Sequence, residues 1–327
     1  MSDFRQTLPQ ASADHWTVSR TLITAAHPSI RVADPAAIIA GLVTVCLWGS
    51  AFVGIRAAGG TFSPGALAIG RLFVSTAVLS VVAVLSHQRI PQRRDLARIA
   101  VYGLLWLGIY SVALNAAERL IDAGTAAMLV ATGPILIAVL SGLFLNEGFP
   151  AGLFVGCAVA FGGSVLIGLA TSRSGAQHGV GILLCVIAIL SYSAAIVIQK
   201  RILGRVTALQ LTWLGSAAAT LACMPFVPTL LKEMPNAHPA AVGWLVYLGA
   251  VPTAIGFLTW TYALRRMTAG RTGSLLYLVP VVAVLLSWAI LGEVPAGLAF
   301  LGGALCLLGV SLARRQRVGG RLGQARL

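Results

Sequence analysis

The sequence predicts an all-α integral membrane protein with ten transmembrane helices arranged as two inverted five-helix repeats. The first observation is composition: hydrophobic residues make up 58% of the 327 residues and charged residues only 10%, whereas about a quarter of an ordinary soluble domain is charged. The second is a series of long apolar runs, and the third is a residue pattern that occurs twice. A soluble chain of this composition would lack the polar surface needed to cover itself, so lipid is the expected solvent.

Ten apolar runs account for the predicted helices. A helix needs about 20 apolar residues to cross about 30 Å of hydrocarbon. The segments between the runs contain glycine, proline and charged residues, as is typical of loops. The runs are residues 37–57, 64–86, 98–117, 123–145, 150–170, 180–199, 207–228, 241–264, 271–291 and 296–313.

The basic residues lie mostly between the apolar runs. A net charge of +14 would raise the question of nucleic-acid binding in a soluble protein. In a membrane protein the positive-inside rule explains it instead, so we expect no nucleic-acid partner. If the N-terminus is cytoplasmic, 18 Lys and Arg residues fall inside and 4 outside, with Arg71 inside a run. This split predicts that both termini are cytoplasmic and that the chain lies in the cell (inner) membrane.

Two polar tails flank the predicted membrane part. Residues 1–36 read as a cytoplasmic tail, with a short interfacial helix near Trp16 to Ile23, and residues 314–327 as a basic cytoplasmic tail. The first tail lacks the apolar stretch and small-residue cleavage site of an export signal. We therefore expect a first five-helix repeat at 37–173 and a second at 179–313.

When the sequence is aligned with itself at an offset of 146 residues, part of the first half matches part of the second half. The identical pairs that carry the pattern are Gly124 with Gly270, Pro134 with Pro280, and Glu147 with Glu293. Each repeat holds five spans, and an odd number means that the second copy enters the membrane upside down. This architecture is typical of secondary transporters, in which two halves rock around a central cavity. The alternative is duplication without transport, as in a membrane scaffold.

Several short motifs are spread along the predicted membrane part. They are Trp48-Gly49-Ser50-Ala51-Phe52, Pro64 with Arg71, Ala123-Gly124 leading to Pro134, Leu145-Asn146-Glu147, Lys200, Ala269-Gly270 leading to Pro280, and Leu291-Gly292-Glu293. With these motifs the sequence resembles the EamA family of the drug/metabolite transporter superfamily over residues 37 to 313. The resemblance implies a ten-helix inverted-repeat fold and, usually, export of metabolites or drugs.

Four charged residues are candidates for function. Arg71, inside the second run, would bind a substrate carboxylate through its bidentate fork, or else pair with Glu118 or snorkel. Glu118, at the outer end of the third run, is the candidate coupling carboxylate. Glu147 and Glu293 stand at helix ends, where a gating or coupling role competes with capping of backbone groups or pairing with a basic residue.

Two prolines lie in the middle of predicted spans. Pro134 and Pro280 each remove a helix hydrogen bond and free the carbonyl four residues earlier, at Val130 and Leu276. The resulting kinks either shape or flex the cavity, or are static.

Aromatic residues near mid-depth are candidates for substrate contact. Tyr and Trp combine an apolar face with a polar group, which suits an amphipathic organic ligand; packing between helices is the alternative. Asn115, nearer a helix end, is expected to serve the cavity or a contact between helices. Thr253 is one of several neutral polar residues at depth, and serine and threonine often bond to their own helix backbone. Trp213 and Trp260 lie nearer the span ends, which predicts interfacial anchoring. The aromatic candidates are Trp48, Trp106, Tyr110, Tyr192 and Tyr277.

No signature of an enzyme is present in the sequence. It contains no phosphate-binding Gly-rich loop, no zinc-protease helix and no Gly-x-Ser-x-Gly motif. The five cysteines lack metal-ligand spacing and the five histidines form no cluster. We therefore expect no catalytic residues, no metal and no cofactor. The expected partners are a small organic substrate and the lipid bilayer, with H⁺ as a candidate coupling ion.

The function predicted from these observations is secondary transport. The leading hypothesis is export of small organic metabolites, amino-acid-like or related, by alternating access. The alternatives are proton-coupled efflux of cationic drugs and, in another class, a membrane scaffold. Gly152 and Gly156 predict a close helix contact, which leaves open whether it lies within one chain or in a homodimer.

Overall fold

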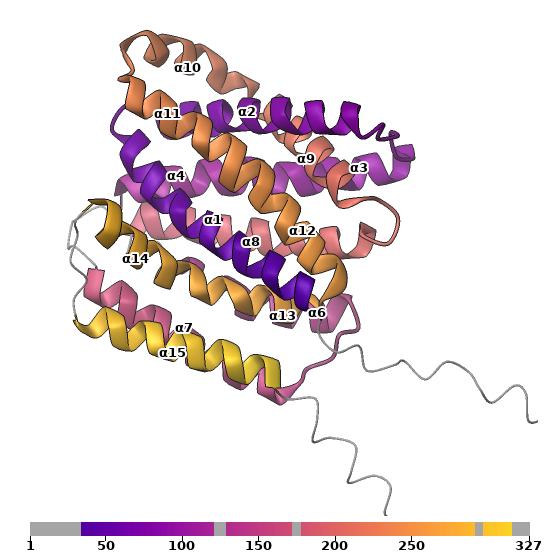
Figure 1. Ribbon diagram of the computed structural model, residues 1–327, viewed down its shortest axis with the longest axis vertical. Coiled ribbons are helices and arrows are strands. Elements are labelled where there is room, and N and C mark those ends of the chain that lie inside the picture. Colours follow the sequence, from indigo (N-terminus) through magenta and orange to yellow (C-terminus); the bar gives the residue numbers. More distant parts are fainter. Residues whose placement is uncertain (1–33, 121–128, 172–177, 292–296, 316–327) are drawn as a thin grey trace, which may run out of the picture. The chain divides into compact units, whose positions relative to one another are not determined.

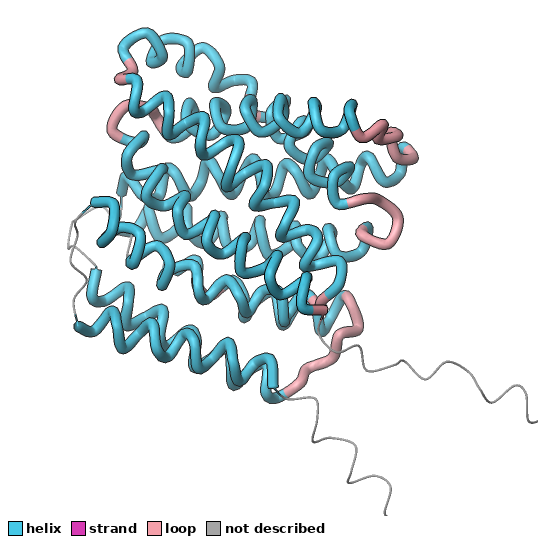
Figure 2. Tube along the Cα trace, in the orientation of Figure 1, coloured by secondary structure: helices cyan, strands magenta, loops and turns pink. Residues whose placement is uncertain are grey.

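The structure is a computed structural model that describes residues 34–120, 129–171, 178–291 and 297–315. Within these ranges the chain forms helices joined by turns, without a strand (Figures 1 and 2). The prediction of an all-α protein is confirmed. The predicted helix near Trp16 to Ile23, most of both tails, and Glu293 lie outside the described residues.

The first half contains five helical regions. The third region is continuous but contains a π-helical stretch, labelled η2, in its middle. The helices are α1 (Pro35–Gly59), α2 (Pro64–Leu85), α3 (Arg93–Tyr102), η2 (Gly103–Tyr110), α4 (Ser111–Leu120), α6 (Gly133–Phe144) and α7 (Ala151–Thr171).

The second half is interrupted more often. A π-helical stretch, η5, joins α11 to α12, and a 3₁₀ turn, η6, joins α13 to α14. The helices are α8 (His178–Ile202), α9 (Ala208–Ala222), η3 (Met224–Phe226), α10 (Val227–Glu233), η4 (Met234–Asn236), α11 (Pro239–Leu248), η5 (Gly249–Ile255), α12 (Gly256–Arg266), α13 (Ala269–Ser274), η6 (Leu275–Leu278), α14 (Val279–Leu291) and α15 (Gly297–Arg315).

Six helices in the described ranges are long and apolar enough to cross a membrane. They become seven if α9 and the segment after it, bent by 54°, count as one span. Three further apolar helices are shorter, at residues 133–144, 151–166 and 300–313. The chain is thus a multi-pass membrane protein, and each predicted apolar run contains a described helix. The count of ten complete spans remains a prediction.

Local sequence explains several helix starts. Pro64 occupies the first turn of α2, where its missing N–H is not needed. Thr207 and Gln210 form a capping box at the start of α9, with bonds of 2.9 and 3.0 Å. The hydroxyl of Thr268 accepts a hydrogen bond from the backbone N–H of Arg271 at 3.4 Å and caps α13.

Glycines allow α7 and α15 to lie side by side (Figure 1). A Cβ atom at Gly156 would meet the backbone of Ala313, and one at Gly309 would meet the carbonyl of Gly156. A Cβ atom at Gly163 would meet the carbonyl of Gly302 at 2.5 Å. The close contact expected at Gly156 is therefore made within one chain.

Helix α1 packs against helices of the second half. Its neighbours are α11, α12 and α14, between which it lies in Figure 1. The hydroxyls of Thr44 and Thr259 form a 2.8 Å hydrogen bond across the contact between α1 and α12. The indole Nε1 of Trp48 donates to the carbonyl of Pro252 at 3.1 Å. The two halves thus interleave, and a cavity lies where they meet.

Candidate functional site

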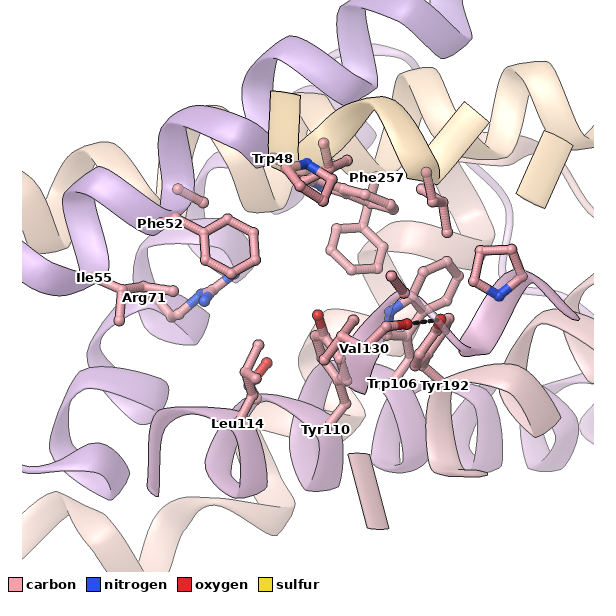
Figure 3. A pocket seen from close by; sticks show the side chains of 17 residues that line it. Trp48, Phe52, Ile55, Arg71, Trp106, Tyr110, Leu114, Val130, Tyr192 and Phe257 are labelled. Carbon is pink, nitrogen blue, oxygen red and sulfur yellow. Dashed lines mark hydrogen bonds between the residues drawn. The ribbon is translucent and has the colours of Figure 1, made fainter. Parts of the chain in front are cut away.

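A cavity is lined by residues of α1, α2, η2, α4, α8, α12, η6 and α14, and by residues around the start of α6. It contains about 850 Å³ of empty space, including its opening to the surroundings. Most of its lining is apolar or aromatic, with a single charged side chain. The residues labelled in Figure 3 are Trp48, Phe52, Ile55, Arg71, Trp106, Tyr110, Leu114, Val130, Tyr192 and Phe257.

Aromatic rings from four helical segments form one wall of the cavity. The ring centroid of Trp106 lies 5.7 Å from that of Trp48, 4.9 Å from Phe257 and 6.1 Å from Tyr192. Tyr110 continues the wall, with its centroid 5.4 Å from that of Tyr192. The pair of Trp106 and Tyr192 is tilted and the other three pairs are edge-to-face, a favourable arrangement for aromatic rings. The wall is therefore a preformed apolar surface for an organic molecule.

Trp106 and Tyr110 are both carried by the π-helical stretch η2. Single π-helical turns inside helices are rare and occur often at functional sites. The predicted shared face is present, because both side chains line the cavity. Gly103, at the start of η2, lies against the backbone of Gly215 on α9, where a Cβ atom would not fit. Close packing on that side directs the aromatic side chains to the other.

Arg71 places its guanidinium group at the cavity (Figure 3). Its Nε and Nη2 both donate to Oγ1 of Thr253, at 3.1 and 2.9 Å. The Thr253 hydroxyl in turn donates to the carbonyl of Leu248 at 2.7 Å. Arg71 forms no ion pair with a carboxylate of the described residues, so the direct pair with Glu118 that was one expectation is not present in this structure. A charged residue inside a membrane span indicates a functional site.

Two candidates lie near the cavity but do not line it. Asn115 is 5% exposed, and its Nδ2 donates to the carbonyl of Pro64 at 3.2 Å, which ties α4 to the start of α2. Tyr277 is fully buried in a packing cluster with Cys157 and Leu153. In this structure both side chains are taken up by packing between helices, and their contact with substrate stays a prediction.

Glu118 lies one helical turn beyond Leu114 on α4. Its Oε1 is buried and has no hydrogen-bond partner among the described residues. The carboxylate interacts electrostatically with Arg71 and Arg56. It is thus a charged group beside the cavity rather than in its lining.

Both prolines mark interruptions of their helices. Pro134 stands in the first turn of α6, directly after a turn at 131–132, and Pro280 stands in the first turn of α14, directly after η6. The carbonyl of Val130 accepts a hydrogen bond from the hydroxyl of Tyr192 at 3.2 Å, shown in Figure 3. The carbonyl of Leu276 accepts from the N–H of Val279. Both prolines line the cavity, so the interruptions shape it.

Glu147 has a backbone partner rather than a place in the cavity. Its Oε1 accepts from the N–H of Ala269 at 2.8 Å, and its Oε2 from the N–H of Gly270 at 3.3 Å. The ammonium group of Lys200 donates to the carbonyls of Leu264 and Met267. These two side chains hold the segment between α12 and α13 from both sides. We call this arrangement the backbone latch.

Two aromatic residues of α12, Phe257 in the cavity lining and Trp260 packed against Trp48 and Trp106, have places that the sequence analysis did not predict. Trp260, expected as an interfacial anchor, is only 1% exposed, and its Nε1 donates to Oε1 of Gln199 at 3.2 Å, so that expectation is wrong. Phe257 lines the cavity one turn away. The repeat contains a signal for it: a shift of 146 residues places Ser111, another lining residue, on Phe257.

Known proteins are similar to this chain in sequence and in fold. The model of the EamA-like transporter family matches residues 35–169 and 179–315. The "Probable terminal-alkyne amino-acid exporter" of Streptantibioticus cattleyicolor is 35% identical over 292 residues, which cover 87% of this chain and 95% of that protein. The "Uncharacterized transporter YdfC" of Bacillus subtilis is 34% identical over 264 residues, covering 81% and 86%.

A solved structure supports the fold independently. The chain titled "Crystal structure of protein" superposes with a TM-score of 0.73, with 22% identity, and covers 86% of this chain and 96% of that one. Because the identity is low, the likeness speaks for the fold alone. The two matches to the family model cover the same two halves of the chain. The chain belongs to the EamA-like transporter family and is a membrane transporter, not an enzyme.

Proposed function

We propose that this protein is a secondary transporter that exports small organic molecules with a carboxylate group, amino-acid-like metabolites or related compounds. The observation that carries the proposal is Arg71: a guanidinium at an apolar cavity, held by Thr253 and without an ion-pair partner in the described ranges. Its Nη1 N–H groups make no hydrogen bond to described residues, so a carboxylate can take them.

The rest of the cavity suits an apolar body of modest size. A volume of about 850 Å³ lies within the range of about 300–1,000 Å³ that is usual for small-molecule sites. Trp48, Trp106, Tyr110 and Tyr192 offer ring faces and edges to an aliphatic, unsaturated or aromatic group. The substrate is thus a molecule with one anionic end and one apolar end.

Transport proceeds by alternating access in this proposal. The two matched segments support a division into a first repeat at 37–173 and a second at 179–313, between tails at 1–36 and 314–327. Helix interruptions at Pro134 and Pro280, in equivalent places, supply points at which each half bends. The backbone latch closes one end of the bundle and must open when the cavity faces that side.

The excess of basic residues on one side supports the orientation. The split of 18 to 4 favours cytoplasmic termini and the inner membrane. In this orientation the backbone latch lies at the cytoplasmic end of the bundle. The name of the relative from Streptantibioticus cattleyicolor, an amino-acid exporter, supports both the outward direction and the substrate class.

Efflux of cationic drugs is the weaker alternative. A cationic substrate in this cavity would lie beside the Arg71 guanidinium, and like charges in a low-dielectric site repel strongly. A scaffold role leaves both the preformed cavity and its charged group without a purpose. H⁺ remains the proposed coupling ion, with Glu118 as the carboxylate that would carry it.

The test compares culture media from cells producing the wild type, Arg71→Gln or Arg89→Gln. Arg89 is an exposed loop residue and provides the same chemical change away from the cavity. We expect one class of carboxylates to accumulate outside with the wild type and Arg89→Gln. Arg71→Gln should lower that accumulation about tenfold or more, because a hydrogen bond to a charged group is worth about 1.5–3 kcal/mol.

All three proteins must be present in the membrane in equal amounts. If wild-type cells enrich no carboxylate in the medium, uptake into proteoliposomes decides between import and no transport. If Arg71→Gln exports as well as the wild type, Arg71 does not bind the substrate and the proposal fails.

A further inference from the structure

A second hollow lies at one end of the helix bundle and shares no lining residue with the central cavity. It is formed by the turn between α2 and α3, the start of α3, the turn between α8 and α9, and the start of α9. It contains about 930 Å³ of empty space, including its opening to the surroundings. Its polar lining residues are Gln92, Arg94, Asp95, Arg205 and Gln210. We call this hollow the arginine pocket.

The arginine pocket has a net positive charge. Arg94 and Arg205 both line it and are exposed. Asp95 is buried, and its Oδ1 lies 3.5 Å from Nη1 of Arg98 and 3.6 Å from Nη1 of Arg205. One carboxylate thus faces two guanidinium groups, so it orients Arg205 without neutralising both. With Arg94, three guanidinium groups lie near one carboxylate, which favours binding of an anion. Guanidinium groups match the geometry of a phosphate in particular.

Hydrogen bonds between side chains and backbone hold the walls of the arginine pocket together. The Oε1 of Gln210 accepts from the N–H of Thr207 at 2.9 Å, and its Nε2 donates to the carbonyl of Arg89 at 2.7 Å. The hydroxyl of Thr207 donates to Oε1 of Gln88 at 2.9 Å. The turn before α3 is thereby tied to the start of α9. The pocket is therefore preformed, which lowers the cost of ordering it around a ligand.

The position of the arginine pocket favours a lipid over a soluble anion. Residues Arg93–Leu120 form one helix long and apolar enough to cross a membrane, and Arg94 is its second residue. Lipid headgroups lie at this depth, beside the ends of membrane spans. Val101 stands about two turns after Arg94 on the same face of α3 and is 45% exposed. Ile90, which also lines the pocket, is 70% exposed. An exposed apolar surface thus adjoins the charged groups, as acyl chains adjoin a headgroup.

We propose that the arginine pocket binds the phosphate headgroup of an anionic phospholipid through Arg94 and Arg205, with the acyl chains against the exposed face of α3. In the proposed orientation the pocket faces the cytoplasm, and basic pockets between helices on that side are known to bind anionic headgroups. The inference does not depend on which substrate the protein transports.

A bound headgroup links the two halves of the chain. Arg94 belongs to the first half and Arg205 to the second. Helix α3 lies alongside α9 (Figure 1) and continues into η2, which contains Trp106 and Tyr110 of the aromatic wall. The lipid therefore stabilises a contact between the halves on which the aromatic wall depends.

The test measures how added lipid changes the melting temperature of the full-length protein in a neutral detergent. The probes are dioctanoyl-phosphatidylglycerol, which is anionic, dioctanoyl-phosphatidylcholine, which is zwitterionic, and inorganic phosphate. The proteins are the wild type, Arg94→Gln, the double variant Arg94→Gln/Arg205→Gln, and the control Arg89→Gln/Arg93→Gln. Arg89 and Arg93 are exposed residues close to Arg94 in the sequence that do not line the pocket, so the control removes the same charge beside it.

We expect phosphatidylglycerol to raise the melting temperature of the wild type with saturation, because a ligand that binds the folded state stabilises it. The concentration needed for half of this effect should rise about tenfold or more in Arg94→Gln/Arg205→Gln, because hydrogen bonds between arginine and phosphate are strong. It should stay within about twofold in the control, since exposed charges contribute little. Arg94→Gln alone should show an intermediate rise. This variant keeps both ion pairs of Asp95, so it tests the proposal even if the loss of Arg205 unfolds the protein.

Four outcomes would overturn the inference. If phosphatidylcholine acts at the same concentrations as phosphatidylglycerol, the protein does not recognise the headgroup charge. If the control weakens binding as much as the pocket variant, the lipid follows the charge of the whole surface. If Arg94→Gln binds as well as the wild type, Arg94 is not a ligand. If inorganic phosphate acts at the same concentrations as phosphatidylglycerol, the pocket binds a soluble anion. None of these measurements involves transport, so the proposed function stands or fails separately.

Discussion

Thr253 gives the Arg71 guanidinium a defined direction. Its hydroxyl accepts from both Nε and Nη2 of Arg71 and donates to the carbonyl of Leu248, so all three groups hold one geometry. Leu248 ends α11, and Thr253 lies in the π-helical stretch η5 that follows it. Because a hydroxyl has no charge, it orients Arg71 without neutralising it. The cation stays available to an anion in the cavity.

Replacement of Thr253 by Val should separate orientation from charge. The valine side chain keeps the shape but removes the acceptor for both N–H groups of Arg71. We expect KM for a carboxylate substrate to rise about tenfold, which corresponds to about 1.4 kcal/mol, with a smaller change in kcat. The concentration dependence of uptake in proteoliposomes measures both. An unchanged KM would show that Thr253 does not position Arg71.

Thr259→Val is the matched control for this substitution. Thr259 lies in α12, the helix that follows η5, and its hydroxyl bonds to the backbone of Gly256 and to Thr44. It does not belong to the cavity lining. KM of Thr259→Val should therefore stay within twofold of the wild-type value.

At the scale of helices, glycine decides which pairs lie in close contact. In α7, Gly156 faces the backbone of Ala313, whereas Gly162 has nothing within 4 Å of a Cβ atom. The two residues share a helix and a residue type but not an environment. Close approach of backbones replaces the hydrophobic effect as a source of helix association in lipid.

Alanine substitutions at these two glycines should have opposite effects on stability. Gly156→Ala introduces an atom where the Ala313 backbone lies, and overpacking typically costs about 1–3 kcal/mol. Gly162→Ala adds a methyl group in open space and should leave the melting temperature unchanged or raise it. Thermal unfolding in detergent measures both. Equal melting temperatures would contradict the close contact between α7 and α15.

The sequence predicted helices better than it predicted their faces. Apolar runs have a length, and length alone indicates a span; Arg71 stood out because a charge inside such a run is rare. Trp260 was misassigned because its distance from a span end says nothing about which neighbours surround it. Asn115 and Tyr277 were chosen for their depth and residue type. Their packing depends on neighbouring helices, which the sequence does not specify. The sequence points to Phe257 only through the repeat, in which Phe257 occupies the position that matches Ser111.

At the scale of the whole membrane part, the cavity belongs to both halves. Helix α1 packs on α11, α12 and α14, and the aromatic wall joins Trp48 and Trp106 of the first half to Tyr192 and Phe257 of the second. A relative rotation of the halves therefore changes the cavity walls together. In the proposed mechanism this couples substrate binding to the exposure of the site.

The orientation proposed from basic residues gives a direct prediction. A green fluorescent protein fused after Leu327 should fluoresce, because it folds in the cytoplasm. An alkaline phosphatase inserted after Gly60, in the turn between α1 and α2, should be active, because that turn should face outward. The reverse pattern of the two reporters would overturn the proposed orientation and place the backbone latch on the outer side.

The backbone latch has a consequence for how this segment tolerates sequence change. Within the described residues, the hydrogen bonds of Glu147 come from the N–H groups of Ala269 and Gly270, and those of Lys200 go to the carbonyls of Leu264 and Met267. Every residue except proline offers both kinds of group. The backbone latch therefore requires the side chains of Glu147 and Lys200. From its four partner residues it requires only the position of the backbone. Substitutions among its four backbone partners can accumulate without removing it, whereas a proline at 269 or 270 removes a donor directly.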